Sequence, residues 1–171
     1  MLLVDAGVAS ETGPRSVAKS HSVKGVCSVD VHGPIDFQAA LDNAFGDLRR
    51  VGLSGYVDQC LGSVDTDIAD GAPEHAFVAF VRQPERTDGP GHAHIRWPDP
   101  MWNQPYRLAS VLVHEATHVF EYWNDQASWG DERGPVAAER TALCSLLTLA
   151  SVDRFTPTPN ASPAALAAAP A

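Results

Sequence analysis

The order of the hydrophobic patterns restricts the fold of this chain more than any other property of its sequence. Up to about residue 97, apolar residues mostly alternate with polar ones or form short apolar runs, as in strands, and one helical pattern interrupts them. From about residue 103 to residue 152, apolar residues recur at helical spacing instead. This order of a strand, a helix, further strands and two closing helices predicts an α+β fold.

The first strand and the first helix are expected before residue 53. Apolar and polar residues alternate through residues 27–31, which predicts a strand with one buried face. Residues 37–51 carry apolar side chains at helical spacing. Asp36 is the expected N-cap of this helix, and Gly52 is the residue expected to end it.

The middle of the chain is expected to contain three strands and a polar loop. The loop at residues 62–74 follows a predicted strand at residues 55–61 and lacks the ligand spacing of an EF-hand, so we interpret it as a solvated turn. The segment 76–81 is apolar on both faces, as in a central strand, whereas residues 92–97 alternate as an outer strand would. The loop carries the aspartates Asp65, Asp67 and Asp70.

Composition indicates one domain in an aqueous compartment. The chain has 171 residues, of which 44% are hydrophobic, so we expect a single domain at residues 23–155 between a loose segment at 1–22 and a Pro/Ala-rich tail at 156–171. A formal charge of −9 argues against nucleic-acid binding. No signal peptide or long apolar run is seen, so we expect a cytoplasmic protein without a membrane partner.

The cysteines do not suggest a metal site or a disulfide framework. Cys27, Cys60 and Cys144 lie far apart in the sequence, and none belongs to a CxxC pair. A metal site in this chain must therefore use other side chains.

The two closing helices are expected at about residues 103–123 and 135–152, and the first contains the sequence His114-Glu115-Ala116-Thr117-His118. Residues four apart on a helix project from one face, so both imidazoles can bind one ion. Zinc accepts imidazole and carboxylate ligands, and a catalytic zinc keeps one position for water. Glu115 is the natural general base for that water, so this helix predicts a catalytic zinc site.

A third protein ligand is needed, and Glu139 in the last helix is the expected one. It shares a helix face with apolar residues, and a buried carboxylate there requires a partner or a metal. An antiparallel neighbouring helix would bring the two histidines close to it. Asp131 and Glu132, in the connection between the two helices, are alternative ligands, although carboxylates also suit the start of a helix without any metal.

Other polar residues are candidates for substrate binding. His92 and His94 share one face of the predicted outer strand and can polarise a substrate carbonyl, and Tyr122 or Tyr106 can stabilise an oxyanion. Exposed strand histidines and packed tyrosines are common without such roles, so both interpretations stay open.

The histidine motif followed by Glu139 in the local sequence AERTA resembles the arrangement in gluzincin metallopeptidases, such as thermolysin-like enzymes and several smaller bacterial ones. The resemblance covers about residues 93–147. It implies a zincin-like fold, with a short mixed sheet packed on an N-terminal helix, the HExxH helix and a glutamate-bearing C-terminal helix. It also implies that the outer strand, here residues 92–97, binds an extended peptide.

These observations together predict zinc-dependent hydrolysis of a peptide or protein substrate. Zinc held by His114, His118 and Glu139 would lower the pKa of its water to about 7, so that Glu115 removes a proton and passes it to the leaving amine. An alternative is a zinc-containing binding or regulatory domain with little hydrolytic activity, which the small size of the chain favours. A third possibility is that the motif arises by chance on an ordinary helix.

Overall fold

The structure is a computed structural model that describes residues 29–66 and 78–155. The predictions for residues 1–22 and 156–171, and for Asp67 and Asp70, lie outside these residues. The described elements are, in order, β1 (Asp30–His32), α1 (Ile35–Arg50), α2 (Ser54–Cys60), β2 (Leu61–Asp65), β3 (Ala79–Arg82), β4 (Gly91–Ile95), the 3-10 helix η2 (Pro100–Asn103), α3 (Arg107–Asn124), the 3-10 helix η3 (Gln126–Ser128) and α4 (Arg133–Phe155).

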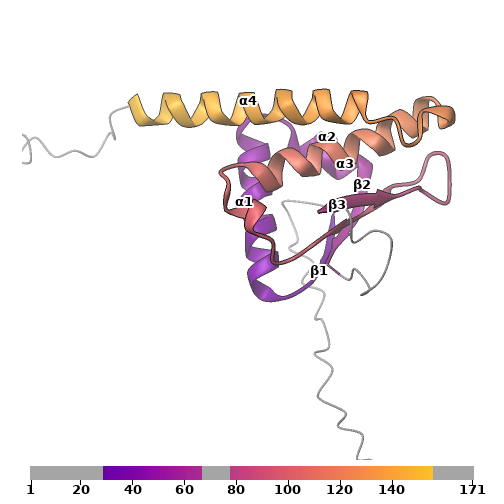
Figure 1. Cartoon of the computed structure of the whole chain (residues 1–171), viewed down its shortest axis with the longest axis horizontal. Helices are drawn as coiled ribbons and strands as arrows, with labels where there is room; N and C mark the ends of the chain where they lie inside the picture. The colour runs from indigo at the N-terminus through magenta and orange to yellow at the C-terminus, as the bar shows by residue number, and fades with distance from the viewer. Residues whose placement is uncertain (1–28, 67–77, 156–171) are drawn as a thin grey trace, which may run out of the picture.

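The strands form one small mixed sheet in the order β1-β2-β4-β3, so the fold is α+β as predicted. Strands β1, β2 and β4 run parallel, and β3 pairs antiparallel with β4. Parallel neighbours need crossover connections, which α1 and α2 supply between β1 and β2. In Figure 1, α4 runs along the top, α3 lies between α4 and the strands, and α1 runs down beside the sheet.

The predicted positions of two strands in the sheet are wrong. Strand β4, expected at the outside, has neighbours on both sides, and β3, expected in the centre, is one of the two edge strands of the described sheet. The apolar character of β3 comes from packing on its faces: Val81 is buried in the core, while Phe80 stacks on the ring of His94 at a centroid distance of 4.8 Å. A strand covered on both faces has an apolar sequence whether or not both of its edges are paired with other strands.

The strand predicted at residues 55–61 is also wrong, since Ser54–Cys60 forms helix α2 and the strand begins at Leu61. Val57 and Cys60 are both fully buried and lie three residues apart, which is a helical spacing. The segment interpreted as a polar loop therefore begins with β2, whose Val64 enters the core while Ser63 and Asp65 lie on the opposite face.

The helix predictions agree with the structure within a few residues at each end. In α1 the N-cap is Pro34 rather than Asp36, and Asp36 instead accepts a hydrogen bond from Nε1 of Trp97 at 3.1 Å. Among the described residues, no helix is both long and apolar enough to cross a membrane. The core contains fully buried side chains from the four α-helices and the sheet, among them Phe37, Leu41, Leu48, Val57, Val64, Ile95, Leu112, Val119 and Leu146.

Helix α3 approaches the sheet closely at Gly91, the first residue of β4. A Cβ atom at this position would lie 2.4 Å from Cγ2 of Val119 and 2.8 Å from Cγ2 of Val81. The absence of a side chain at Gly91 thus allows the helix that carries the histidines to rest directly on β3 and β4.

Candidate metal centre

The two histidines of the motif lie on α3, as predicted, and point to the same side of the helix. Their rings are 5.0 Å apart between centroids, and the side chains of His114 and His118 are 15% and 10% exposed. Burial lowers the pKa of His118, and the nearby Glu132 carboxylate opposes this shift. A lowered pKa favours the neutral imidazole, which is the form that binds metals.

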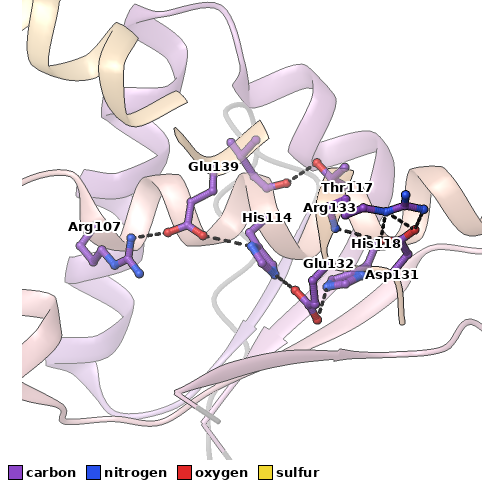
Figure 2. A network of polar contacts seen from close by, with 9 residues as sticks. Arg107, His114, Thr117, His118, Asp131, Glu132, Arg133 and Glu139 are labelled. Atoms are coloured by element: carbon purple, nitrogen blue, oxygen red, sulfur yellow. Dashed lines mark hydrogen bonds and ion pairs between the residues drawn. The ribbon is translucent and has the colours of Figure 1, made fainter. Parts of the chain in front are cut away.

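Glu132 is the carboxylate that the structure brings to both histidines. Its Oε2 lies 3.1 Å from Nε2 of His114, and its Oε1 lies 3.5 Å from Nε2 of His118. Figure 2 shows this carboxylate facing the two rings. These three residues are the group of possible metal ligands found among the described residues, with their ligand atoms within 4.8 Å of one another.

The spacing of these atoms fits a zinc ion. Zinc binds imidazole nitrogen and carboxylate oxygen at about 2.0–2.2 Å, so two ligand atoms of a tetrahedral site lie roughly 3.3 Å apart. Glu132 Oε2 lies 3.1 Å from His114 and Glu132 Oε1 lies 3.5 Å from His118, and one ligand atom from each residue lies within 4.8 Å of the others, so a small movement of these side chains brings them to this spacing. Imidazole and carboxylate are also the ligand types that zinc accepts.

Asp131 and Glu132, considered together in the sequence, have different positions. Asp131 accepts a hydrogen bond from the backbone N–H of Arg133 at 3.0 Å and pairs with the guanidinium of the same residue, so it serves the start of α4. These contacts lower the pKa of Asp131 to about 2. Glu132 precedes the first residue of α4, its backbone carbonyl accepts from Val136 N at 3.0 Å, and its side chain reaches the histidines of α3.

Glu139 lies against His114, but on the opposite side of the ring from Glu132. Its Oε2 is 3.0 Å from Nδ1 of His114, and its Oε1 pairs with the guanidinium of Arg107 (Figure 2). The side chain of Glu139 is 13% exposed. Glu139, predicted as the third ligand, thus contacts Nδ1 of His114, the ring nitrogen on the side away from Glu132.

A cleft of about 410 Å³ opens beside these side chains. Its polar lining comes from His114, Glu115, His118 and Glu132. The rest of its wall is apolar and comes from edge strand β3 and from the connection that precedes α4: Ala79, Phe80, Val81, Trp129 and Gly130. The cleft therefore places possible metal ligands, a carboxyl group and an apolar surface together, as in many ligand sites.

Glu115 lines this cleft and is 4% exposed. Burial, together with smaller effects of the charges on Glu132 and Glu139, raises the pKa of Glu115 to about 8, although a hydrogen bond from the backbone of Val81 opposes the shift. A buried carboxyl group with such a pKa, in a cleft with two histidines, is typical of acid–base residues in active sites.

The three residues predicted to bind substrate do not line the cleft. His92 and His94 project from the sheet face opposite the core, where His92 Nδ1 is 2.7 Å from Ser63 Oγ and His94 is buried against Phe80. Tyr122 is 6% exposed and packs edge-on against Trp129, with ring centroids 5.4 Å apart.

Sequence reasoning missed two residues of the site, Arg107 and Trp129. Arg107 precedes His114 by seven residues, which is two helical turns, so the same spacing that placed the histidines together would have placed Arg107 on their face. The ring of Trp129 lies near the rings of both His118 and Tyr122, with centroids 6.1 and 5.4 Å away. The residue belongs to the short connection between α3 and α4, where no periodic sequence pattern marks it.

No family model, curated protein or solved structure matches this chain.

Proposed function

We propose that this protein is a zinc-dependent peptidase of the gluzincin type, with the metal held by His114, His118 and Glu132. The observation that carries the proposal is the convergence of these three ligand groups beside the buried Glu115 in one cleft. The zincin-like scaffold is part of the proposal, supported by an HExxH helix that packs against a mixed sheet with an antiparallel edge strand.

Glu132 replaces Glu139 in the proposed ligand set because of what each carboxylate contacts. Both oxygens of Glu132 face Nε2 atoms that border the cleft. Both oxygens of Glu139 are already engaged, one by Arg107 and one by Nδ1 of His114. Glu139 is therefore proposed as a partner of the ligand His114 rather than as a ligand itself.

Glu115 acts first as base and then as acid in the proposed reaction. A bound zinc ion would polarise the substrate carbonyl, lower the pKa of water and, by its charge, favour the ionised form of Glu115. Glu115 then takes a proton from the attacking water and delivers it to the leaving amine when the amide bond breaks. The low exposure of this carboxyl group keeps competing water away from the proton.

The edge strand β3 supports a peptide as the substrate. Val78 O accepts from Arg96 N at 2.8 Å, and Phe80 lies opposite His94, so alternate residues from Val78 form the hydrogen-bonded pairs with the strand beside them. The backbone groups of Ala79 and Val81 then point away from β4, where the Val81 N–H meets the carboxyl group of Glu115, and both residues line the cleft. An extended peptide can add to this edge as a further strand.

The experiment measures zinc per chain and peptide cleavage for the wild type and four variants, one of which, Glu139→Ala, removes the carboxylate on the other side of the His114 ring. Glu132→Ala removes the proposed third ligand, and Glu115→Gln removes the base while leaving the ligands in place. Asp131→Ala is the matched control, since this neighbour of Glu132 contacts Arg133 and lies outside the proposed ligand set. A library of fluorogenic peptides serves as the substrate.

We expect one zinc per chain in the wild type, in Glu115→Gln and in Asp131→Ala, and a strong loss in Glu132→Ala. Cleavage should require Glu115. Zinc binding without any Glu115-dependent cleavage would instead support a zinc-containing binding domain. A wild type that takes up no zinc would rule out the proposal, and loss of zinc in Glu139→Ala but not in Glu132→Ala would return Glu139 to the ligand set.

A further inference from the structure

We infer that Arg107 and Glu139 form a positioning pair that fixes the ring of His114 for metal binding. This inference rests on the proposed function, since it assigns a role to residues behind a proposed ligand. Neither residue lines the cleft, so the pair acts through His114 and not on the substrate.

The hydrogen bond between Glu139 and His114 selects one form of the imidazole. A neutral ring carries a single N–H, and metal binding through Nε2 leaves that hydrogen on Nδ1, where the Glu139 carboxylate lies 3.0 Å away to accept it. The lone pair on Nε2 is then directed to the side where Glu132 lies. The same bond limits rotation of the ring, so Nε2 keeps its direction.

Arg107 stabilises the Glu139 carboxylate in the position from which it contacts the His114 ring. Its guanidinium pairs with Oε1 of Glu139, and the two side chains are 29% and 13% exposed. A carboxylate with so little solvent needs a charged partner, and Arg107 supplies it from the first turn of α3. Without this partner, one oxygen of Glu139 loses its charged contact and the carboxylate is free to rotate away from His114.

The backbone at Tyr106 and the first turn of α3 hold Arg107 in position at the start of the helix. Tyr106 adopts a left-handed conformation with φ 62°, which is uncommon for a residue with a side chain. Its carbonyl accepts from Ser110 N at 2.9 Å, and Ser110 Oγ donates to the carbonyl of Arg107 at 2.9 Å. These bonds hold the first turn of the helix, so Arg107 and His114 keep their relation along one helix face.

The test compares zinc affinity in single and double variants by competition with a chelator of known affinity. The variants are Arg107→Ala, Arg107→Lys, Glu139→Ala and the double variant Arg107→Ala/Glu139→Ala. Arg140→Ala is the matched control, because this exposed arginine neighbours Glu139 on α4 and lines no part of the cleft. The visible spectrum of the Co²⁺-substituted proteins reports the ligand geometry separately from affinity, and circular dichroism reports folding.

Loss of an outer partner of a metal-binding histidine typically weakens metal affinity by about 10- to 100-fold. We expect a loss of this size in Arg107→Ala and in Glu139→Ala, a smaller loss in Arg107→Lys and none in Arg140→Ala. Because the two residues act as one unit, Arg107→Ala should weaken affinity by less than about twofold in the Glu139→Ala background. The Co²⁺ spectrum should change in both single variants.

Several outcomes would overturn the inference. One is an affinity in folded Arg107→Ala within twofold of the wild type, and another is a double variant whose loss equals the product of the single losses. If Arg107→Ala does not fold, Arg107→Lys decides in its place, and an unchanged Co²⁺ spectrum with unchanged affinity contradicts the role. A wild type that binds no zinc would overturn the proposed function itself, and the positioning role with it.

Discussion

Glu132 and Glu139 contact opposite nitrogens of one imidazole ring, that of His114. Glu132 Oε2 lies 3.1 Å from Nε2, and Glu139 Oε2 lies 3.0 Å from Nδ1. Their surroundings differ as well, since the Glu132 side chain is 62% exposed and that of Glu139 is 13% exposed. Two carboxylates seven residues apart thus have different expected roles, one toward the cleft and one toward the protein interior.

Zinc should raise the melting temperature of the wild type, and the two glutamates should reduce this effect unequally. A ligand that binds only the folded state stabilises it by about 2.7 kcal/mol at one hundred times its dissociation constant. We expect the largest shift in the wild type, a smaller one in Glu139→Ala and almost none in Glu132→Ala. Differential scanning fluorimetry with and without zinc measures the shift in melting temperature. A larger shift in Glu132→Ala than in Glu139→Ala would make Glu139 the ligand and Glu132 its partner.

The stability of the metal-free protein should fall with rising pH because of Glu115. Burial raises its pKa from 4.5 to about 8, so the folded state keeps the proton over a range in which the unfolded chain has lost it. The contribution is fully present below pH 4.5 and is lost as the pH rises toward 8. We expect the free energy of unfolding of the wild type, relative to Glu115→Gln, to decrease across this window in urea titrations. A constant difference between the two proteins would contradict the raised pKa.

Proline at position 79 should weaken peptide binding. The Ala79 N–H points away from β4, so proline removes a donor at the open edge without removing a bond of the sheet. Since one hydrogen bond contributes about 0.5–1.5 kcal/mol, KM should rise by roughly 2- to 13-fold with little change in kcat. Ala79→Ser, which keeps the N–H, is the control. Equal KM values in the two variants would argue against docking along β3.

Alanine at position 91 should destabilise the protein by overpacking. The added methyl group would meet Val119 and Val81, both buried, within 3 Å. Overpacking of a core typically costs about 1–3 kcal/mol, and we expect a loss of this size in the free energy of unfolding measured with urea. Gly55→Ala is the control: nothing lies within 4 Å of its Cβ, and alanine favours helix α2. A neutral Gly91→Ala would show that α3 can move away from the sheet.

The helices and the histidine face could be predicted because their signal is periodic. His114, Glu115 and His118 lie on one helix, and the spacing of the apolar residues around them fixes which side meets the core. The order of the strands could not be predicted in this way. Apolar residues on both faces of β3 report what covers those faces, whereas an edge is defined by backbone partners that side chains do not encode.

Whether Glu139 or Glu132 would lie at the ligand position could not be predicted from the sequence for a related reason. The apolar face of the last helix placed Glu139 toward the protein interior, where it is 13% exposed. The pattern could not tell which nitrogen of His114 it would meet. Glu132 precedes the first turn of α4, and the direction of such a residue depends on the path of the connection rather than on any repeat.

The closeness of the three proposed ligands along the chain has a consequence for how the protein assembles. His114 and His118 lie on α3 and Glu132 lies directly before α4, the next α-helix in the chain, whereas the parallel strands β1, β2 and β4 are spread over residues 30–95. Contacts between sequence neighbours form faster in folding than the pairing of parallel strands. We expect the α3–α4 hairpin to form before the parallel strands β1, β2 and β4 have paired, so that the three ligand groups meet before the sheet is complete.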